Sequence, residues 1–197
     1  MTLDFWFEFA STYSYPAAMR VERLARDAGV RLRWRPFLLG PIFFSQGWND
    51  SPFNLYPAKG RYMWRDLERI CDREGLPLTL PPLRFPQNGL KAARIALSGE
   101  AAPWLPDFVR GAYRANFAEQ KGIADDAVLT EILARAGADP AAAVAAANAP
   151  ENKDRLKKQN EEAIACGVFG APSFTVGDEL FWGNDRLEEA IAWAARS

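Results

Sequence analysis

The stretch that decides the fold opens the chain: LDFWFEFASTYSYPAAMRVERLARDAGVRLRWR, residues 3–35. Apolar side chains alternate over residues 3–9, which predicts a β-strand, and the additional apolar Trp6 indicates that both faces of this strand are covered. Pro16 fits the first turn of a following helix, Gly29 ends that helix, and residues 30–35 alternate again. A strand, a helix and a strand in this order predict a βαβ unit with parallel strands.

The middle of the chain has a different pattern. Residues 36–57 contain four prolines and two glycines, and we expect a long ordered loop there, followed by a second proline-rich loop over residues 77–86. Helical periodicity with suitable start and stop signals predicts six helices, over residues 62–74, 88–97, 103–118, 126–136, 139–147 and 151–165.

Strands return near the end of the chain. Residues 173–176 and 179–181 flank Gly177-Asp178, a two-residue hairpin signal, and Asp185 is expected to cap a last helix. The order βαβ, helices, ββα is that of an α/β thioredoxin-like fold with an inserted α-helical domain. We therefore expect one discontinuous thioredoxin-like domain, residues 1–38 plus 166–197, and an inserted helical domain, residues 39–165.

Composition excludes several classes of function. The 197 residues include no histidine, so a Ser-His-Asp triad, a Cys-His pair and histidine-ligated zinc are impossible within this chain. A net charge of −1 gives no electrostatic reason to expect nucleic acid or an anionic membrane as partner. No apolar run approaches the roughly 20 residues that span a bilayer, and no basic segment opens the chain. We expect a soluble, cytoplasmic protein without a metal site.

The two cysteines, Cys71 and Cys166, lie far apart and form no CxxC motif. This spacing excludes a disulfide framework, a multi-cysteine zinc site and the usual redox dithiol. We interpret both as reduced structural thiols of a cytosolic protein.

Ser11 occupies the place where the first strand ends and the first helix is about to begin. Unpaired backbone N–H groups and the positive end of the helix dipole meet there, and thioredoxin-fold redox enzymes place their reactive cysteine at this point. Three interpretations remain open. Ser11 or Ser14 caps the helix; Ser11 is a nucleophile, which the lack of a histidine to activate it disfavours; or Ser11 donates a hydrogen bond to the thiolate of another molecule.

Two further features lie near the end of the chain. Pro172 directly precedes a predicted strand, so the Ala171–Pro172 bond is either cis or an ordinary trans bond at a strand start, and the thioredoxin order favours cis. Residues 181–186, FWGNDR, precede the last helix, whose N-terminus can bind a carboxylate with help from Arg186.

These motifs together resemble one family. Residues 7–15, FEFASTYSY, resemble the F-x-F-x-S-P-[YF]-S-Y opening of 2-hydroxychromene-2-carboxylate isomerases and kappa-class glutathione transferases. Residues 167–186 resemble the cis-proline loop and the W-G-N-D-R signature of the same family, and residues 49–62 resemble its N-x-x-P-x-N…K…Y loop. Thr12 departs from the pattern, since the family usually has proline there.

The resemblance implies a DsbA-like fold and a glutathione-dependent enzyme. By position, Ser11 would contact the glutathione sulfur. The backbone of Ala171, before Pro172, would pair with the tripeptide, and Asn184 and Asp185 would hold its γ-glutamyl end.

The resemblance also implies a site for a small aromatic second substrate. Asn54 matches a position near that substrate, Asn49 is a weaker candidate, and Phe85 or Arg84 in the second loop would face it. The implied activity is isomerisation in aromatic catabolism, by a homodimer. Two alternatives remain: a kappa-type transferase that conjugates glutathione to electrophiles, and a non-catalytic protein that binds glutathione or apolar ligands.

Overall fold

A mixed four-stranded sheet forms the centre of the computed structural model, which describes residues 1–196. Its strands are β1 (Thr2–Phe7), β2 (Arg31–Pro36), β3 (Ser173–Val176) and β4 (Glu179–Trp182), in the spatial order β2-β1-β3-β4. β1 pairs in parallel with β2 and antiparallel with β3, and β3 and β4 form the predicted hairpin. The βαβ and ββα units of a thioredoxin-like sheet are thus confirmed.

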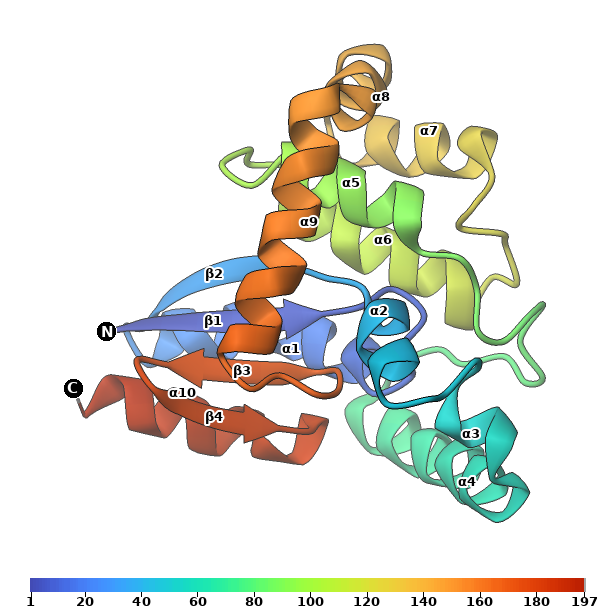
Figure 1. The fold of residues 1–197 in the computed structure, drawn as a ribbon, viewed down its shortest axis with the longest axis vertical. Coiled ribbons are helices and arrows are strands. Elements are labelled where there is room, and N and C mark those ends of the chain that lie inside the picture. The colour runs from blue at the N-terminus through green and yellow to red at the C-terminus, as the bar shows by residue number, and fades with distance from the viewer. Residues whose placement is uncertain (197) are drawn as a thin grey trace.

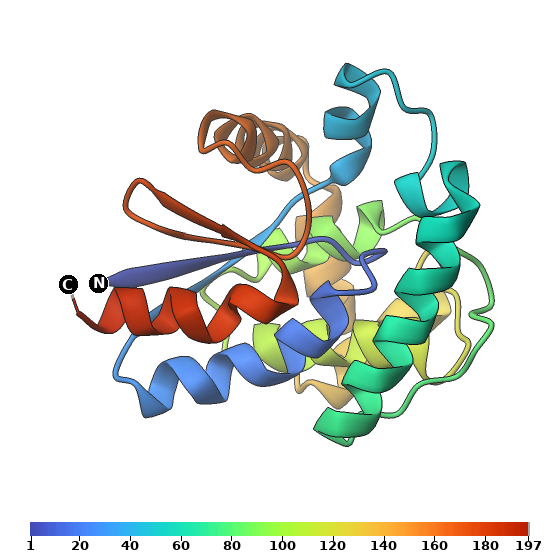
Figure 2. The same cartoon turned by 90° about the horizontal axis from the view of Figure 1, so that it is seen from below.

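Helices cover both faces of this sheet (Figures 1 and 2). Helix α1 (Ser14–Asp27) and helix α10 (Leu187–Ala195) lie on one face, and helix α9 (Pro150–Ala165) crosses the other. Phe5 and Phe7 of β1 belong to the main hydrophobic core, whereas Trp6 belongs to a second, smaller core. The prediction from Trp6 that this strand is covered on both faces is confirmed.

The remaining helices lie between β2 and β3 in the chain. They include α4 (Pro57–Glu74), α5 (Leu90–Ser98), α6 (Leu105–Phe117), α7 (Asp126–Arg135) and α8 (Pro140–Asn148), all close to the predicted ranges. The main core continues from the strands into these helices, because the ring of Phe9 packs on Tyr113 and Phe108 of α6 with centroids 5.4 and 6.1 Å away. The division into two domains stays a prediction.

The expectation that residues 36–57 form a loop is wrong. This segment contains helix α2 (Leu39–Ser45) and the short helix α3 (Pro52–Leu55), and α4 begins at Pro57 rather than at residue 62. The physical reason is that Pro52 and Pro57 occupy the first positions of α3 and α4, where a proline loses no helical hydrogen bond and its fixed φ favours the helix.

The prediction that Asp185 caps the last helix is also wrong. A 3₁₀ turn, Asn184–Arg186, precedes α10, and neither element has a side-chain cap. Gly183, with φ of 114°, turns the chain, and its carbonyl accepts the Arg186 N–H at 3.1 Å. Asp185 is therefore exposed beside Arg186, with 3.4 Å between their charged groups. No helix within residues 1–196 is both long enough and apolar enough to cross a membrane.

Replacement of Trp6 tests the second core. Its indole is 1% exposed, donates to Thr175 Oγ1 at 3.0 Å, and lies under the Arg35 guanidinium, 4.5 Å from the ring centroid. Trp6→Ala should lower the free energy of unfolding by about 3–5 kcal/mol, because it leaves a cavity and removes the hydrogen bond to Thr175 and the ring contact with Arg35. Phe44→Ala, at a residue 79% exposed, is the control and should change it by less than about 0.5 kcal/mol in urea titrations.

Candidate functional site

A cavity of about 1690 Å³ lies beside the carboxyl end of β1. The start of α1, the segment from α2 to α4, the loop at residues 85–90 and the segments 169–171 and 182–186 form its walls. Its surface is rich in aromatic side chains: Phe43, Phe44, Trp48, Phe53, Phe85, Phe169 and Trp182. The size and the lining suit a small organic ligand with apolar parts.

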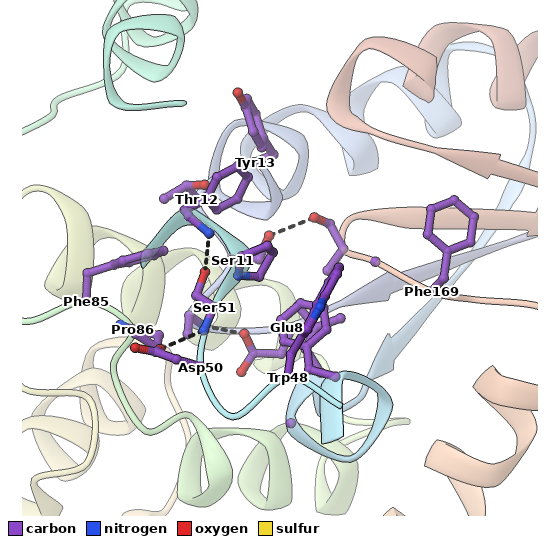
Figure 3. A pocket seen from close by; sticks show the side chains of 18 of the residues that line it. Glu8, Ser11, Thr12, Tyr13, Trp48, Asp50, Ser51, Phe85, Pro86 and Phe169 are labelled. Carbon is purple, nitrogen blue, oxygen red and sulfur yellow. Dashed lines mark hydrogen bonds between the residues drawn. The ribbon is translucent and has the colours of Figure 1, made fainter. Parts of the chain in front are cut away.

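Ser11 lies on this cavity and joins two distant parts of the chain (Figure 3). Its Oγ donates to the carbonyl oxygen of Ala171 at 2.9 Å and accepts the N–H of Ser14 at 3.2 Å. The Ala171–Pro172 bond is cis, as predicted, and its loop faces Ser11. Ser11 therefore satisfies an N–H at the start of α1 and also faces the cavity, so the capping and ligand-binding interpretations are compatible.

Sequence reasoning missed Glu8, which shares a turn with Ser11. The Ser11 N–H donates to the Glu8 carbonyl at 3.0 Å, the Ala10 N–H donates to Glu8 Oε2 at 2.8 Å, and the residue is 7% exposed. Burial raises the pKa of the Glu8 carboxyl to about 7, although the hydrogen bonds from Ala10 and Ser11 act in the opposite direction. The alternation over residues 3–9 indicates only that Glu8 is polar; the signal that could have found it is an acidic residue between two phenylalanines, three positions before Ser11.

Three other predicted residues lie on the same side of the cavity as Ser11. Ala171, Asn184 and Asp185 all line it, whereas Pro172 is buried and lies outside the lining. The Asn184 amide oxygen accepts from Arg20 of α1 at 3.0 Å. The structure thus brings together backbone, amide and carboxylate groups that the sequence separates by up to 174 positions.

The residues expected around a second substrate divide into two groups. Asn49 and Phe85 line the cavity, and Phe85 packs edge-on against Trp64 with centroids 4.9 Å apart. Asn54 lies outside the lining, with its amide donating to both oxygens of Asp50 at 3.1 Å and to the Phe85 carbonyl at 3.4 Å. Arg84 is exposed and also lies outside the lining. Asn49 is therefore better placed than Asn54 for direct contact.

Tyr13 and Lys59 are further polar groups of the cavity that sequence reasoning did not single out as site residues. The Tyr13 hydroxyl donates to Asp66 of α4 at 3.0 Å, and burial together with this carboxylate raises the pKa of the phenol well above its ordinary value. The Lys59 ammonium lies over the ring of Tyr56, 4.8 Å from its centroid. Tyr13 thus stays protonated at neutral pH, and Lys59 supplies positive charge to the wall.

The architecture and site define a class of protein. A sheet in thioredoxin order, helices between its two halves, and a cis-proline loop facing the start of α1 are features of a thioredoxin-like domain of the DsbA kind. The family model "DSBA-like thioredoxin domain" matches residues 2–191.

Similarity to curated proteins then identifies the family within this class. The chain is 32% identical to 2-hydroxychromene-2-carboxylate isomerase of Sphingobium xenophagum, over 95% of this chain and 94% of the relative. It is 31% identical to the protein of that name from Pseudomonas putida, over 95% and 91%, and 25% identical to human glutathione S-transferase kappa 1, over 95% and 88%. The solved structure of a 2-hydroxychromene-2-carboxylate isomerase superposes with a TM-score of 0.86 at 27% identity, covering 100% of this chain and 95% of that one. The chain belongs to the 2-hydroxychromene-2-carboxylate isomerase family within the DsbA-like thioredoxin domains, as the sequence motifs predicted.

The buried carboxyl of Glu8 predicts how stability depends on pH. The folded protein holds this proton up to about pH 7 and the unfolded chain only to about 4.5, so between these values the folded state binds more protons. The free energy of unfolding therefore falls as pH rises through this window, by about 3 kcal/mol in full.

Glu8→Gln removes this titration while keeping an acceptor for the Ala10 N–H. The variant should equal or exceed the wild type in stability at pH 8, and its advantage should shrink towards pH 4.5. Urea titrations at several pH values measure the difference. A constant difference across the window contradicts the assignment.

Proposed function

We propose that this protein is a glutathione-dependent isomerase of the 2-hydroxychromene-2-carboxylate type. The observation that carries the proposal is the Ser11 hydroxyl, held between the start of α1 and the cis-proline loop on the wall of a large aromatic cavity. In a chain of this family without histidine, that arrangement favours a thiol supplied by a bound tripeptide over a nucleophile of the protein itself.

Ser11 stabilises the thiolate of glutathione. A free thiol has a pKa of roughly 8.5, so only a few per cent of it is ionised at pH 7. The dipole of α1, backbone N–H groups and the Ser11 hydroxyl all favour the anion. The Ser11 hydroxyl has one hydrogen, which it gives to Ala171 in this structure, and it reaches the sulfur by turning away from that carbonyl.

The rest of the tripeptide follows the same wall. The backbone of Ala171, which lines the cavity, pairs with the peptide. Asn184 and Asp185 hold the γ-glutamyl end, with Arg20 fixing the Asn184 amide from behind.

The second substrate occupies the aromatic part of the cavity. Asn49 and Phe85 contact it directly, whereas Asn54 acts through the loops that its amide connects. The thiolate adds to the alkene of a conjugated 2-oxo acid, the former double bond rotates, and the thiolate leaves again, so glutathione is regenerated. We also propose, on the family resemblance, that the protein acts as a homodimer in the cytoplasm.

Ser11→Ala tests the role of the hydroxyl. The loss of its hydrogen bond to the thiolate, worth about 1.5–3 kcal/mol, should lower turnover at neutral pH on the order of tenfold to a hundredfold. The deficit should shrink as pH rises, because the thiol then ionises without help. Turnover is followed by the ultraviolet absorbance of the chromene, and ionisation of the bound thiol by the ultraviolet absorbance of its thiolate.

The fold should survive this change, since a lost cap costs about 1 kcal/mol. Glutathione affinity, measured by calorimetry, should fall less than turnover because the peptide contacts remain. Wild-type turnover that is independent of glutathione contradicts the proposal. Conjugation of glutathione to electrophiles without isomerisation favours a kappa-type transferase, and binding without either activity favours a ligand-binding protein.

The two cysteines provide an independent test of where the reactive sulfur lies. Both are free; Cys71 is buried in α4, where burial raises its pKa to about 11, and Cys166 is exposed just after α9. Neither lines the cavity. The double variant Cys71→Ala/Cys166→Ser should keep glutathione-dependent turnover within a few-fold. Loss of activity in a folded double variant places the sulfur chemistry on the protein.

A further inference from the structure

The carboxyl of Glu8 is a group of the cavity that thiolate addition does not use. Its Oε2 accepts the Ala10 N–H, and its Oε1 lies on the side of Gly89, 3.1 Å from where a β-carbon on that glycine would stand. No arginine or lysine within residues 1–196 forms an ion pair with it. A buried carboxyl without a charged partner gains and loses a proton far more readily near neutral pH than an exposed one.

The substrate of the proposed function needs such a group. In 2-hydroxychromene-2-carboxylate one ring carbon carries the hydroxyl, the carboxylate and the ring oxygen, so the carbonyl is masked as a cyclic hemiketal. The alkene becomes conjugated to a ketone only after the ring opens. Opening moves one proton from the hydroxyl to the ring oxygen, and this chain has no histidine to carry it.

Other titratable groups of the cavity are less suited to this step. Asp50 is exposed and its carboxylate accepts from the Asn54 amide and the Ser51 N–H, and Asp185 is exposed beside Arg186. The Tyr13 hydroxyl already donates to Asp66. Glu8 shares its turn with Ser11, so its carboxyl and the proposed position of the glutathione sulfur lie on one wall (Figure 3).

We propose that Glu8 is a catalytic residue that carries this proton and so opens the chromene ring before the thiolate adds; the proposal rests on the isomerase function proposed above. The Glu8 carboxylate removes the hydroxyl proton, and the electrons of that O–H bond form the carbonyl. The bond from this carbon to the ring oxygen breaks, its electron pair goes to the ring oxygen, and Glu8 returns the proton there to give the phenol. Glu8 ends as the carboxylate with which it began.

The titratable groups around Glu8 lie behind it and across the cavity. Behind it, the Tyr113 hydroxyl of α6 donates to the Glu8 carbonyl at 2.9 Å and stays protonated, because burial raises the pKa of that phenol well above its ordinary value. Across the cavity, the charged side chains of the lining are Asp50, Lys59, Asp66, Arg73, Asp185 and Arg186. The Glu8 carboxyl itself titrates at about pH 7, where both of its protonation states are accessible.

Two substrates separate ring opening from thiolate addition. The first is 2-hydroxychromene-2-carboxylate. The second is the open-chain cis 2-oxo acid with its phenol blocked as a methyl ether, which cannot close and needs only addition, rotation and expulsion of the thiolate. Both are assayed with glutathione by ultraviolet absorbance, after subtraction of the uncatalysed rate.

Glu8→Gln should slow turnover of the chromene by about a hundredfold or more, the usual range for a lost general acid–base. It should leave turnover of the methyl ether within about threefold of the wild type. Glu8→Asp, which retains a carboxyl, should recover part of the chromene activity. Glu68→Gln, at a residue of α4 outside the cavity lining, is the matched control and should behave as the wild type with both substrates.

The pH profiles give a second readout. Wild-type kcat/KM for the chromene should rise through an ionisation near pH 7 that is absent from the methyl-ether profile and from the Glu8→Gln variant. The role of Glu8 is overturned if folded Glu8→Gln loses turnover equally with both substrates, or if it retains full turnover of the chromene. Failure of the wild type to isomerise either substrate with glutathione instead overturns the isomerase function on which this role rests.

Discussion

The site depends on the close approach of the start of α1 to the cis-proline loop, where the Ser11 hydroxyl donates to the Ala171 carbonyl across 160 positions of sequence. Each side of this contact is also supported from elsewhere. On one side Ser11 accepts the Ser14 N–H within the helix start, and on the other the Pro172 carbonyl accepts the Gly183 N–H. The turn at Glu8, the proline loop and the segment before α10 therefore hold one another in place.

The segments between β2 and β3 complete the walls of the cavity around this junction. Helices α2, α3 and α4 supply aromatic side chains of the lining, and the loop that includes Phe85 forms another side. Polar contacts tie these segments together: Asn54 connects α3 to the loop at Phe85, and Tyr13 connects α1 to Asp66 of α4. The thioredoxin-like sheet thus provides the end of the cavity at Ser11, where we propose that the thiol binds, and the intervening helices provide most of its aromatic lining.

The absence of histidine makes the placement of the few polar groups decisive. A hydroxyl at a helix start stabilises an anion without taking a proton, and a buried carboxyl can carry a proton without being a strong base. Ser11 and Glu8 lie three residues apart, and the single turn between them places both on the cavity wall. Under the two proposals, one short segment therefore supplies both the hydroxyl that stabilises the thiolate, from Ser11, and the carboxyl that transfers the proton, from Glu8.

The sequence by itself determined the parts of this protein that rest on local patterns. Alternation around Trp6 and the Gly177-Asp178 turn predicted the first strand, its covering on both faces and the hairpin, because these patterns lie in neighbouring residues. The order of elements along the chain, rather than the residues beside Pro172, favoured the cis bond. Family motifs located Ser11, Ala171, Asn184 and Asp185, which the structure brings to one cavity.

Only the tertiary structure decided the rest. Proline density could not reveal that Pro52 and Pro57 start helices, since the same residue also marks loops, and the capping pattern at Asp185 was overridden by the turn at Gly183. Asn54 lies outside the cavity lining because its amide bonds to the loop at Phe85, which is distant in sequence. Glu8 is buried because Gly89 and α6, also distant in sequence, pack against it. Burial, which sets the chemistry of a carboxyl, is a property of the assembled fold and is not encoded in the residue and its neighbours alone.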